Sequence, residues 1–195
     1  MSGVTAEQLI ENLRVEIEAH RTSEAASAAQ ENGKHEPRLV VIGVDSSDFS
    51  RKAVEWAAQN VLKKDDLVVL MTIWEECMEF TRDAGFEMDT YGLVMIRRDD
   101  IKEHNEQALR DGRELLVKTF KKYLKENTVF PLLVSTTSPS KSAIGDLMCR
   151  ASSVIHADFI VVGCRGLGAF KRFFMGSVSK YVSEHATQPV VIVKD

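Results

Sequence analysis

Three glycines and a serine near the C-terminus have a spacing that suits a phosphate chain: Gly163, Gly166, Gly176 and Ser177. Because glycine has no Cβ, backbone N–H groups beside it can approach a ligand closely. An apolar run leads into the first glycine, and apolar residues at helical spacing follow Ser177. The start of a helix offers unpaired N–H groups and the positive end of the helix dipole to an anion. The sequence therefore predicts a polyphosphate site in a strand-to-helix loop.

Hydroxyl and cationic side chains that could assist lie in or next to this loop: Arg165, Lys171, Arg172, Ser177 and Ser179. The pattern is neither a Walker A loop nor the dinucleotide fingerprint, since no G-x-x-x-x-G-K-[ST] occurs and the glycines read G-x-x-G-x-G. A simpler alternative is that Gly163 and Gly166 end a strand and Gly176 begins a helix, with no ligand between them. The local residues favour phosphate binding without naming the ligand.

A carboxylate could act beside the phosphates. The apolar run over residues 39–44 ends in Asp45, and the serines that follow are candidate caps for the next helix. Parallel strands bring their carboxyl ends to one edge of a sheet, and ligands bind there at the point where the strand order reverses. Asp45 and the glycine loop could therefore line one crevice. Asp45 is the candidate base or metal ligand in it.

Five apolar segments predict the strands that must position these residues: 39–44, 67–74, 132–136, 158–162 and 190–193. Apolar residues at helical spacing predict helices between them, the longest over 98–126. No period holds over 75–96, so we expect a long loop there. Strands that alternate with helices predict an α/β fold, in which a single domain holds an open parallel sheet of five strands with helices on both faces.

Residues 1–37 differ in composition from the rest of the chain. Residues 5–8 have the form of a capping box, and an apolar stripe at helical spacing follows: Leu9, Ile10, Leu13 and Ile17. From residue 19 to 36 the chain is polar, which is typical of a fraying helix or a linker. Two interpretations stay open, a helix that docks on a partner or on the domain itself, and a mobile tail. We expect the domain to span 38–195.

The composition restricts the class of protein. The chain of 195 residues is 44% apolar and 28% charged, which is ordinary for a globular domain. A net charge of −4 argues against nucleic acid or an anionic membrane as the main partner, and no apolar run reaches the roughly 18–20 residues that span a bilayer. Cys77, Cys149 and Cys164 share no C-x-x-C spacing and predict reduced thiols. With no signal-peptide core, we expect a cytoplasmic protein.

These residues carry a family resemblance. Residues 38–195 resemble the ATP-binding subgroup of the universal stress protein family, whose nucleotide motif G-x2-G-x9-G-[ST] is matched by the three glycines and Ser177. The segment VIGVDSSDFSRKAVEWA resembles the family's first strand, aspartate loop and first helix. The resemblance implies strand order 3-2-1-4-5 in an adenine nucleotide alpha hydrolase-like fold, with an adenine nucleotide between the first and fourth strands.

The resemblance also implies site residues at four places in the chain. They are Gly43, Val44 and Asp45 after the first strand, Ile73 in the second, Val162, Gly163, Cys164, Arg165 and Gly166 in the loop, and Gly176, Ser177, Val178 and Ser179 at the helix start. Mg²⁺ or Mn²⁺ would accompany ATP, with Asp45 as the protein's metal ligand. Two residues depart from the family pattern: Thr137 replaces a common glycine, and Cys164 replaces a commoner serine.

We therefore predict an ATP-binding stress-response or signalling module with little intrinsic turnover. The alternative is a slow ATPase or an adenylyl- or phosphoryl-transfer enzyme on the same fold. A third hypothesis is a dimerisation scaffold that binds no nucleotide. We also predict a homodimer through the apolar edge strand Val190 to Val193, which carries no edge protection. The alternative to the dimer is that helix 5–18 folds back over this edge and gives a monomer.

Overall fold

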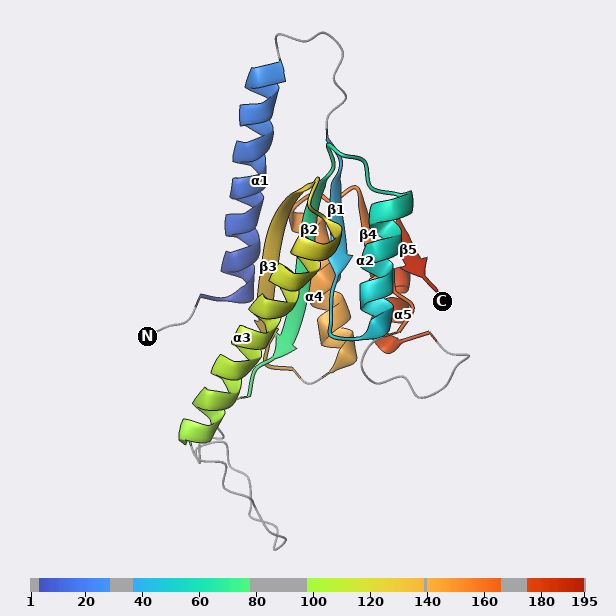
Figure 1. The fold of residues 1–195 in the computed structure, drawn as a ribbon. Coiled ribbons are helices and arrows are strands. Elements are labelled where there is room, and N and C mark those ends of the chain that lie inside the picture. The colour runs from blue at the N-terminus through green and yellow to red at the C-terminus, as the bar shows by residue number, and fades with distance from the viewer. Residues whose placement is uncertain (1–3, 29–36, 78–97, 139, 166–174, 195) are drawn as a thin grey trace, which may run out of the picture.

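The computed structural model describes residues 4–28, 37–77, 98–138, 140–165 and 175–194 (Figure 1). The elements in chain order are α1 (Ala6–Ala28), β1 (Leu39–Gly43), α2 (Asp48–Asn60), β2 (Leu67–Glu75), α3 (Arg98–Tyr123), β3 (Thr128–Thr136), α4 (Lys141–Val154), β4 (Phe159–Gly163), α5 (Ser177–His185) and β5 (Val190–Val193). The strands form one sheet of order β3-β2-β1-β4-β5, with every neighbouring pair parallel. The predicted fold class and strand order are confirmed.

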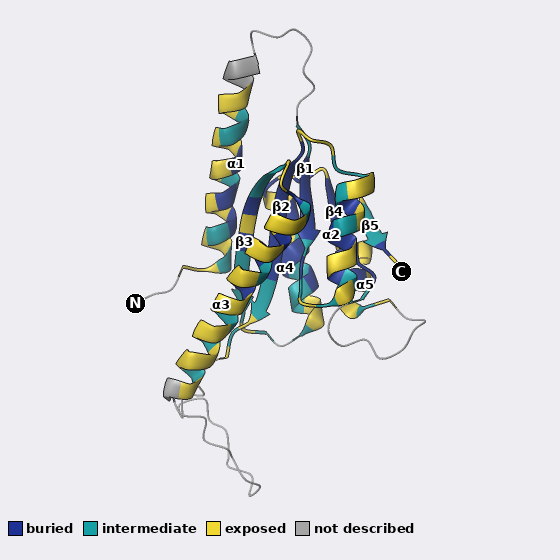
Figure 2. Cartoon of the chain, in the orientation of Figure 1, coloured by how far each residue is buried: buried dark blue, intermediate teal, exposed yellow. Residues whose placement is uncertain are grey.

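Helices cover both faces of the sheet, and Figure 2 shows the strands buried between them. On one face, α1, α4 and α5 pack against alternate strand residues such as Val41 and Ile160. On the other face, α2 and α3 pack against the intervening residues, such as Ile42 and Val161. Since consecutive strand residues point to opposite faces, a strand that is apolar at every position must be covered on both sides. This explains the unbroken apolar runs in the sequence.

The third strand differs from its prediction. It begins at Thr128 rather than Leu132, so Pro131 lies inside the strand and pairs with Leu70 of β2. The proline is tolerated because β3 is an edge strand and has a neighbour on one side only. At the end of the long helix α3, Phe120 is 38% exposed, whereas Leu124, just after the helix, is fully buried.

The N-terminal helix packs on the domain itself. Ile10, Leu13 and Ile17 are all buried in the core that α4 shares with the sheet, and Ile17 is only 1% exposed. The predicted capping box is confirmed, since the Thr5 N–H donates to Gln8 Oε1 and the Gln8 N–H donates to Thr5 Oγ1. The helix lies against β3 and α4 (Figure 1). It is therefore at the β3 edge of the sheet, and β5 forms the opposite edge. The alternative in which this helix covers the β5 edge is therefore wrong.

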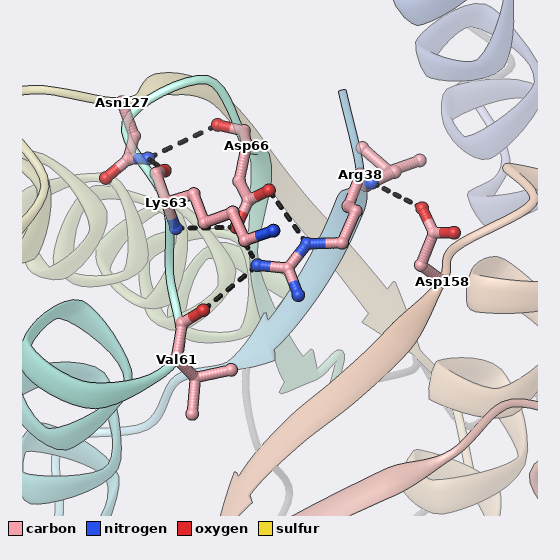
Figure 3. Close-up of polar contacts among 7 residues, drawn as sticks. Arg38, Val61, Lys63, Asp66, Asn127 and Asp158 are labelled. Atoms are coloured by element: carbon pink, nitrogen blue, oxygen red, sulfur yellow. Dashed lines mark hydrogen bonds and ion pairs between the residues drawn. The ribbon is translucent and has the colours of Figure 1, made fainter. Parts of the chain in front are cut away.

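Polar contacts hold the amino-terminal ends of the strands together (Figure 3). Asp66, only 2% exposed, accepts hydrogen bonds from Arg38 Nε at 3.0 Å and Nη2 at 2.6 Å, and from the Lys63 N–H at 2.7 Å. Asn127 Nδ2 donates to the Lys63 carbonyl at 2.7 Å, and Asp158 Oδ2 accepts from the Leu39 N–H at 2.6 Å. The starts of β1, β2 and β4 are thus fixed by buried or half-buried polar groups at the end of the sheet away from the glycine loop.

Candidate functional site

The candidate site lies where the strand order reverses. From β1 the chain runs outward through β2 to β3, and it then returns to β4 on the other side of β1. Strands β1 and β4 are direct neighbours, with Ile42 paired to Val161, and they end at Gly43 and Gly163. The loop with Asp45 and the glycine loop therefore leave the same edge of the sheet side by side, as the sequence predicted.

The Asp45 loop is ordered by its own serines. Asp45 Oδ1 accepts from both the Ser47 N–H and the Ser47 hydroxyl, and the Asp45 N–H donates to Ser50 Oγ at 2.9 Å. Ser47 also caps α2, because its Oγ accepts from the Ser50 N–H at 3.1 Å. These contacts hold the carboxylate at the mouth of the loop, beside the first turn of α2. The Asp45 carboxylate is therefore held in one orientation by these hydrogen bonds.

The glycine loop is pinned at both ends. The Cys164 N–H donates to the Val193 carbonyl, and the Gly176 N–H donates to the Cys164 carbonyl, each at 2.8 Å. A Cβ on Gly163 would lie 2.7 Å from the backbone oxygen of Phe49, so only glycine lets β4 pass this close to α2. Gly166 of the motif lies outside the described residues.

Helix α5 begins at a residue that has no side chain to cap it. Gly176 is its N-cap, with φ −63° and ψ 150°, and it supplies no capping hydrogen bond. The first N–H groups of a helix have no partner within the helix, and those of Ser177, Val178 and Ser179 receive no hydrogen bond from a side chain of the N-cap residue. An anion at this point would satisfy them.

The two predicted serines differ in their surroundings. Ser177 is exposed, whereas Ser179 is 4% exposed and its Oγ donates to the Gly163 carbonyl at 2.7 Å. The hydroxyl of Ser179 therefore ties α5 to the end of β4, so a ligand at the helix start could use only its backbone N–H. Val178 packs against the core beneath.

The remaining predicted residues lie near the carboxyl ends of β1, β2 and β4. The Val44 N–H donates to the Met71 carbonyl at 2.8 Å, and Thr72 Oγ1 donates to the Val44 carbonyl at 2.9 Å, so the end of β1 is fastened to β2. Ile73 is half-buried on β2, and Val162 is buried on β4. The sequence did not predict the role of Thr72. A threonine inside an apolar strand does not show which carbonyl its hydroxyl will bind.

Sequence reasoning also missed Phe49. Its ring lies under the Arg165 guanidinium, with Cζ 5.1 Å from the ring centroid. No spacing rule relates a residue in the first turn of α2 to one that follows β4, and the contact exists because the two elements leave the same edge of the sheet.

The described residues include no group of three or more His, Cys, Asp or Glu side chains that could hold a metal ion. A metal at Asp45 would therefore need oxygen ligands from a bound phosphate chain, as Mg²⁺ commonly has. The chemistry of Asp45 fits such an ion, because carboxylate oxygens are ligands that Mg²⁺ takes.

The family profile of the universal stress proteins matches residues 36–194. The chain belongs to the universal stress protein family. A universal stress protein A-like protein of Arabidopsis thaliana is 24% identical over 170 residues, covering 82% of this chain and 91% of that protein.

Solved structures of the family share the fold. The universal stress protein UspA from Lactobacillus plantarum superposes with a TM-score of 0.57 at 18% identity, over 82% of this chain and 99% of that one. A universal stress protein in complex with cAMP gives a TM-score of 0.53 at 22% identity, over 80% and 96% of the two chains. At this level of identity the similarity establishes the fold.

Proposed function

We propose that this universal stress protein binds ATP in the crevice between β1 and β4 and acts as a nucleotide-dependent stress-response or signalling module with little turnover. The observation that carries the proposal is the start of α5. There an uncapped helix end meets a glycine loop whose two ends are closed on each other by the bond from the Gly176 N–H to the Cys164 carbonyl. A helix start without a capping side chain suits a phosphate.

The proposed positions of the adenine base and of the metal ion follow from the same geometry. We place the adenine ring beside the half-buried Ile73 and the buried Val162, which are apolar and lie on the same face of the sheet, whereas Val44 packs on the other face. Adenine is further supported by the solved relative described as a complex with cAMP. Asp45 would hold Mg²⁺ or Mn²⁺ together with the phosphate oxygens, and the ion would neutralise part of their charge.

The crevice supports binding better than catalysis. Phosphoryl transfer needs a residue that positions or deprotonates the nucleophile, and Asp45 Oδ1 already accepts two hydrogen bonds from Ser47. His185 stacks on Tyr181 with the ring centroids 4.0 Å apart, at the far end of α5 from the glycine loop. A slow ATPase or adenylyl-transfer enzyme remains the second candidate because Asp45 is adjacent to the loop.

The central test replaces Gly176 by aspartate, with serine as the matched control. Both side chains are good N-caps and the backbone φ of −63° suits them, so both variants should fold as stably as the wild type. The aspartate would place a negative charge where the phosphates should lie. We expect calorimetry to show ATP binding abolished in Gly176→Asp and retained within about tenfold in Gly176→Ser.

Mass spectrometry of the nucleotide released from the denatured wild-type protein would identify the base and the number of phosphates. Unchanged ATP affinity in a folded Gly176→Asp variant would contradict the proposed site. Steady release of ADP at a rate above buffer, abolished by Asp45→Asn, would favour the enzyme over the binding module.

We further propose a homodimer formed through β5, in the cytoplasm. Val190, Val191 and Ile192 are apolar but only half-buried, and β5 has a sheet neighbour on one side only. An edge of this kind invites pairing with a second copy across a two-fold axis. Val191→Pro should yield monomers in sedimentation, since proline removes an N–H from the edge. A wild type that sediments as a monomer would contradict the dimer.

The described part of the chain contains no helix that is long and apolar enough to cross a membrane.

A further inference from the structure

Phe49 occupies the junction between the two loops of the crevice. It stands in the first turn of α2, two residues after the N-cap Ser47. Its backbone touches β4 so closely that a Cβ on Gly163 would lie 2.7 Å from the Phe49 oxygen and 2.8 Å from its carbonyl carbon. Its half-buried ring lies under the guanidinium of Arg165, at 5.1 Å from Cζ to centroid.

A ring in this position attracts the guanidinium and restricts where it can lie. Arginine stacks face-on against aromatic rings, and the attraction is electrostatic because the ring face carries negative charge density. The five N–H donors of arginine lie in the guanidinium plane, so stacking leaves them directed sideways rather than into the ring. That orientation is the one in which arginine donates two parallel hydrogen bonds to a phosphate.

The backbone of Arg165 lies next to the start of α5. Arg165 directly follows Cys164, whose carbonyl accepts from the N–H of Gly176, the residue at which α5 begins. The side chain that meets Phe49 therefore leaves the chain beside this helix start. A cation there favours a ligand more strongly as its phosphate charge rises, and contributes little to binding of an uncharged nucleoside.

We propose that Phe49 is a positioning residue that makes the site prefer phosphorylated adenosine, and above all ATP, by holding Arg165 beside the start of α5. This inference rests on the proposed function, since it needs an adenine nucleotide in the crevice. Phe49 lies in α2, outside the glycine motif, and its ring contacts Arg165 at the start of the loop.

The test compares ATP, AMP and adenosine binding by calorimetry in the full chain carrying Phe49→Leu or Phe49→Tyr. Leucine keeps an apolar side chain but removes the ring face, whereas tyrosine keeps the face. We expect Phe49→Leu to weaken ATP binding about fivefold, AMP binding less, and adenosine binding less than about twofold. Phe49→Tyr should match the wild type for all three ligands.

Arg165→Met and the double variant Phe49→Leu/Arg165→Met complete the experiment. If Phe49 acts through Arg165, the double variant should bind ATP no more weakly than Arg165→Met alone. Equal losses for ATP and adenosine in Phe49→Leu, or additive losses in the double variant, would overturn the inference while leaving the nucleotide site intact. A wild type that binds none of the three ligands would instead overturn the proposed function itself.

Discussion

The two ends of the sheet are built in opposite ways. At the amino-terminal end, the buried Asp66 accepts three hydrogen bonds and Arg38 also donates to the Val61 carbonyl at 3.0 Å, so charges and backbone groups satisfy each other (Figure 3). At the carboxyl-terminal end, the strands run into glycines, and α5 begins with no capping side chain. One end therefore has its polar groups paired within the protein, and the other presents N–H groups that a ligand can use.

We therefore expect changes at the amino-terminal end to affect mainly stability, and changes at the carboxyl-terminal end to affect mainly the proposed binding. A buried carboxylate is stable only when its partners are present, which makes the amino-terminal end sensitive to single changes. Backbone N–H groups at a helix start need no particular side chain, so we expect side-chain changes at the carboxyl-terminal end to cost less, unless they fill the space of a glycine or remove the hydroxyl of Ser179. Four predictions test this comparison.

The largest effect should come from Asp66→Ala. It removes the acceptor for Arg38 and for the Lys63 N–H, so we expect the free energy of unfolding to fall by about 2–4 kcal/mol. Affinity for ATP, measured at a temperature at which the variant is folded, should not change. The matched control is Asp65→Ala, which removes an exposed carboxylate one residue earlier and should shift stability by less than about 0.5 kcal/mol.

Two glycines that end strands should differ when each is replaced by alanine. The Cβ of Gly163→Ala would meet the Phe49 backbone at 2.7 Å, and a backbone cannot move cheaply, so we expect a loss of about 1–3 kcal/mol in urea unfolding. The Cβ of Gly43→Ala would meet the flexible end of Met148, which can rotate away, and this variant should lie within about 1 kcal/mol of the wild type. Equal losses would show that the contact with Phe49 is not the constraint.

Ser179→Ala should cost about 1–2 kcal/mol of stability, because it leaves the buried Gly163 carbonyl without its hydroxyl donor. Thermal unfolding measures this, with Ser183→Ala as the control, since Ser183 is exposed on the same helix and its hydroxyl donates to the Lys180 carbonyl. If Ser179 acts on the ligand through its backbone alone, the ATP affinity of the folded variant should stay within about twofold.

The smallest effect concerns the ion pair between Glu7 of α1 and Arg150 of α4, at 3.3 Å, whose side chains are 66% and 51% exposed. A hydrogen bond from its own backbone, followed by one from Arg150, lowers the pKa of Glu7 below its ordinary value of 4.5. The pair therefore stabilises the fold above that pH, and the contribution is lost as the pH falls through the lowered pKa.

Glu7→Gln should accordingly reduce stability by about 0.2–1 kcal/mol at neutral pH. The difference from the wild type should shrink towards zero as the pH falls below the lowered pKa of Glu7. Urea unfolding of both proteins across this range checks the prediction. A difference that grows on acidification would mean that the glutamate is not held as the charged form.

Much of the fold was readable from the sequence because the signals are local. The apolar runs at β1, β2 and β4 can only be strands covered on both faces, and the serines after β1 cap α2 as predicted. The third strand was predicted too short because proline normally ends a strand, whereas at the edge of the sheet Pro131 is tolerated inside β3. The sequence also gives no sign that Gly112 lets α3 approach Leu133 of β3.

The sequence by itself determined the groups that a phosphate site would need. They are a loop with glycines at fixed spacing, a helix start after it, and Asp45 after a buried strand. Spacing along one segment decides these, because backbone N–H groups and helix ends are properties of neighbouring residues. The tertiary structure alone decided that Phe49 meets Arg165, that Ser179 binds the Gly163 carbonyl, and that α1 packs on β3 and α4. Those contacts join residues far apart in the chain, and they form only once the order of the strands brings two segments to the same edge or face of the sheet.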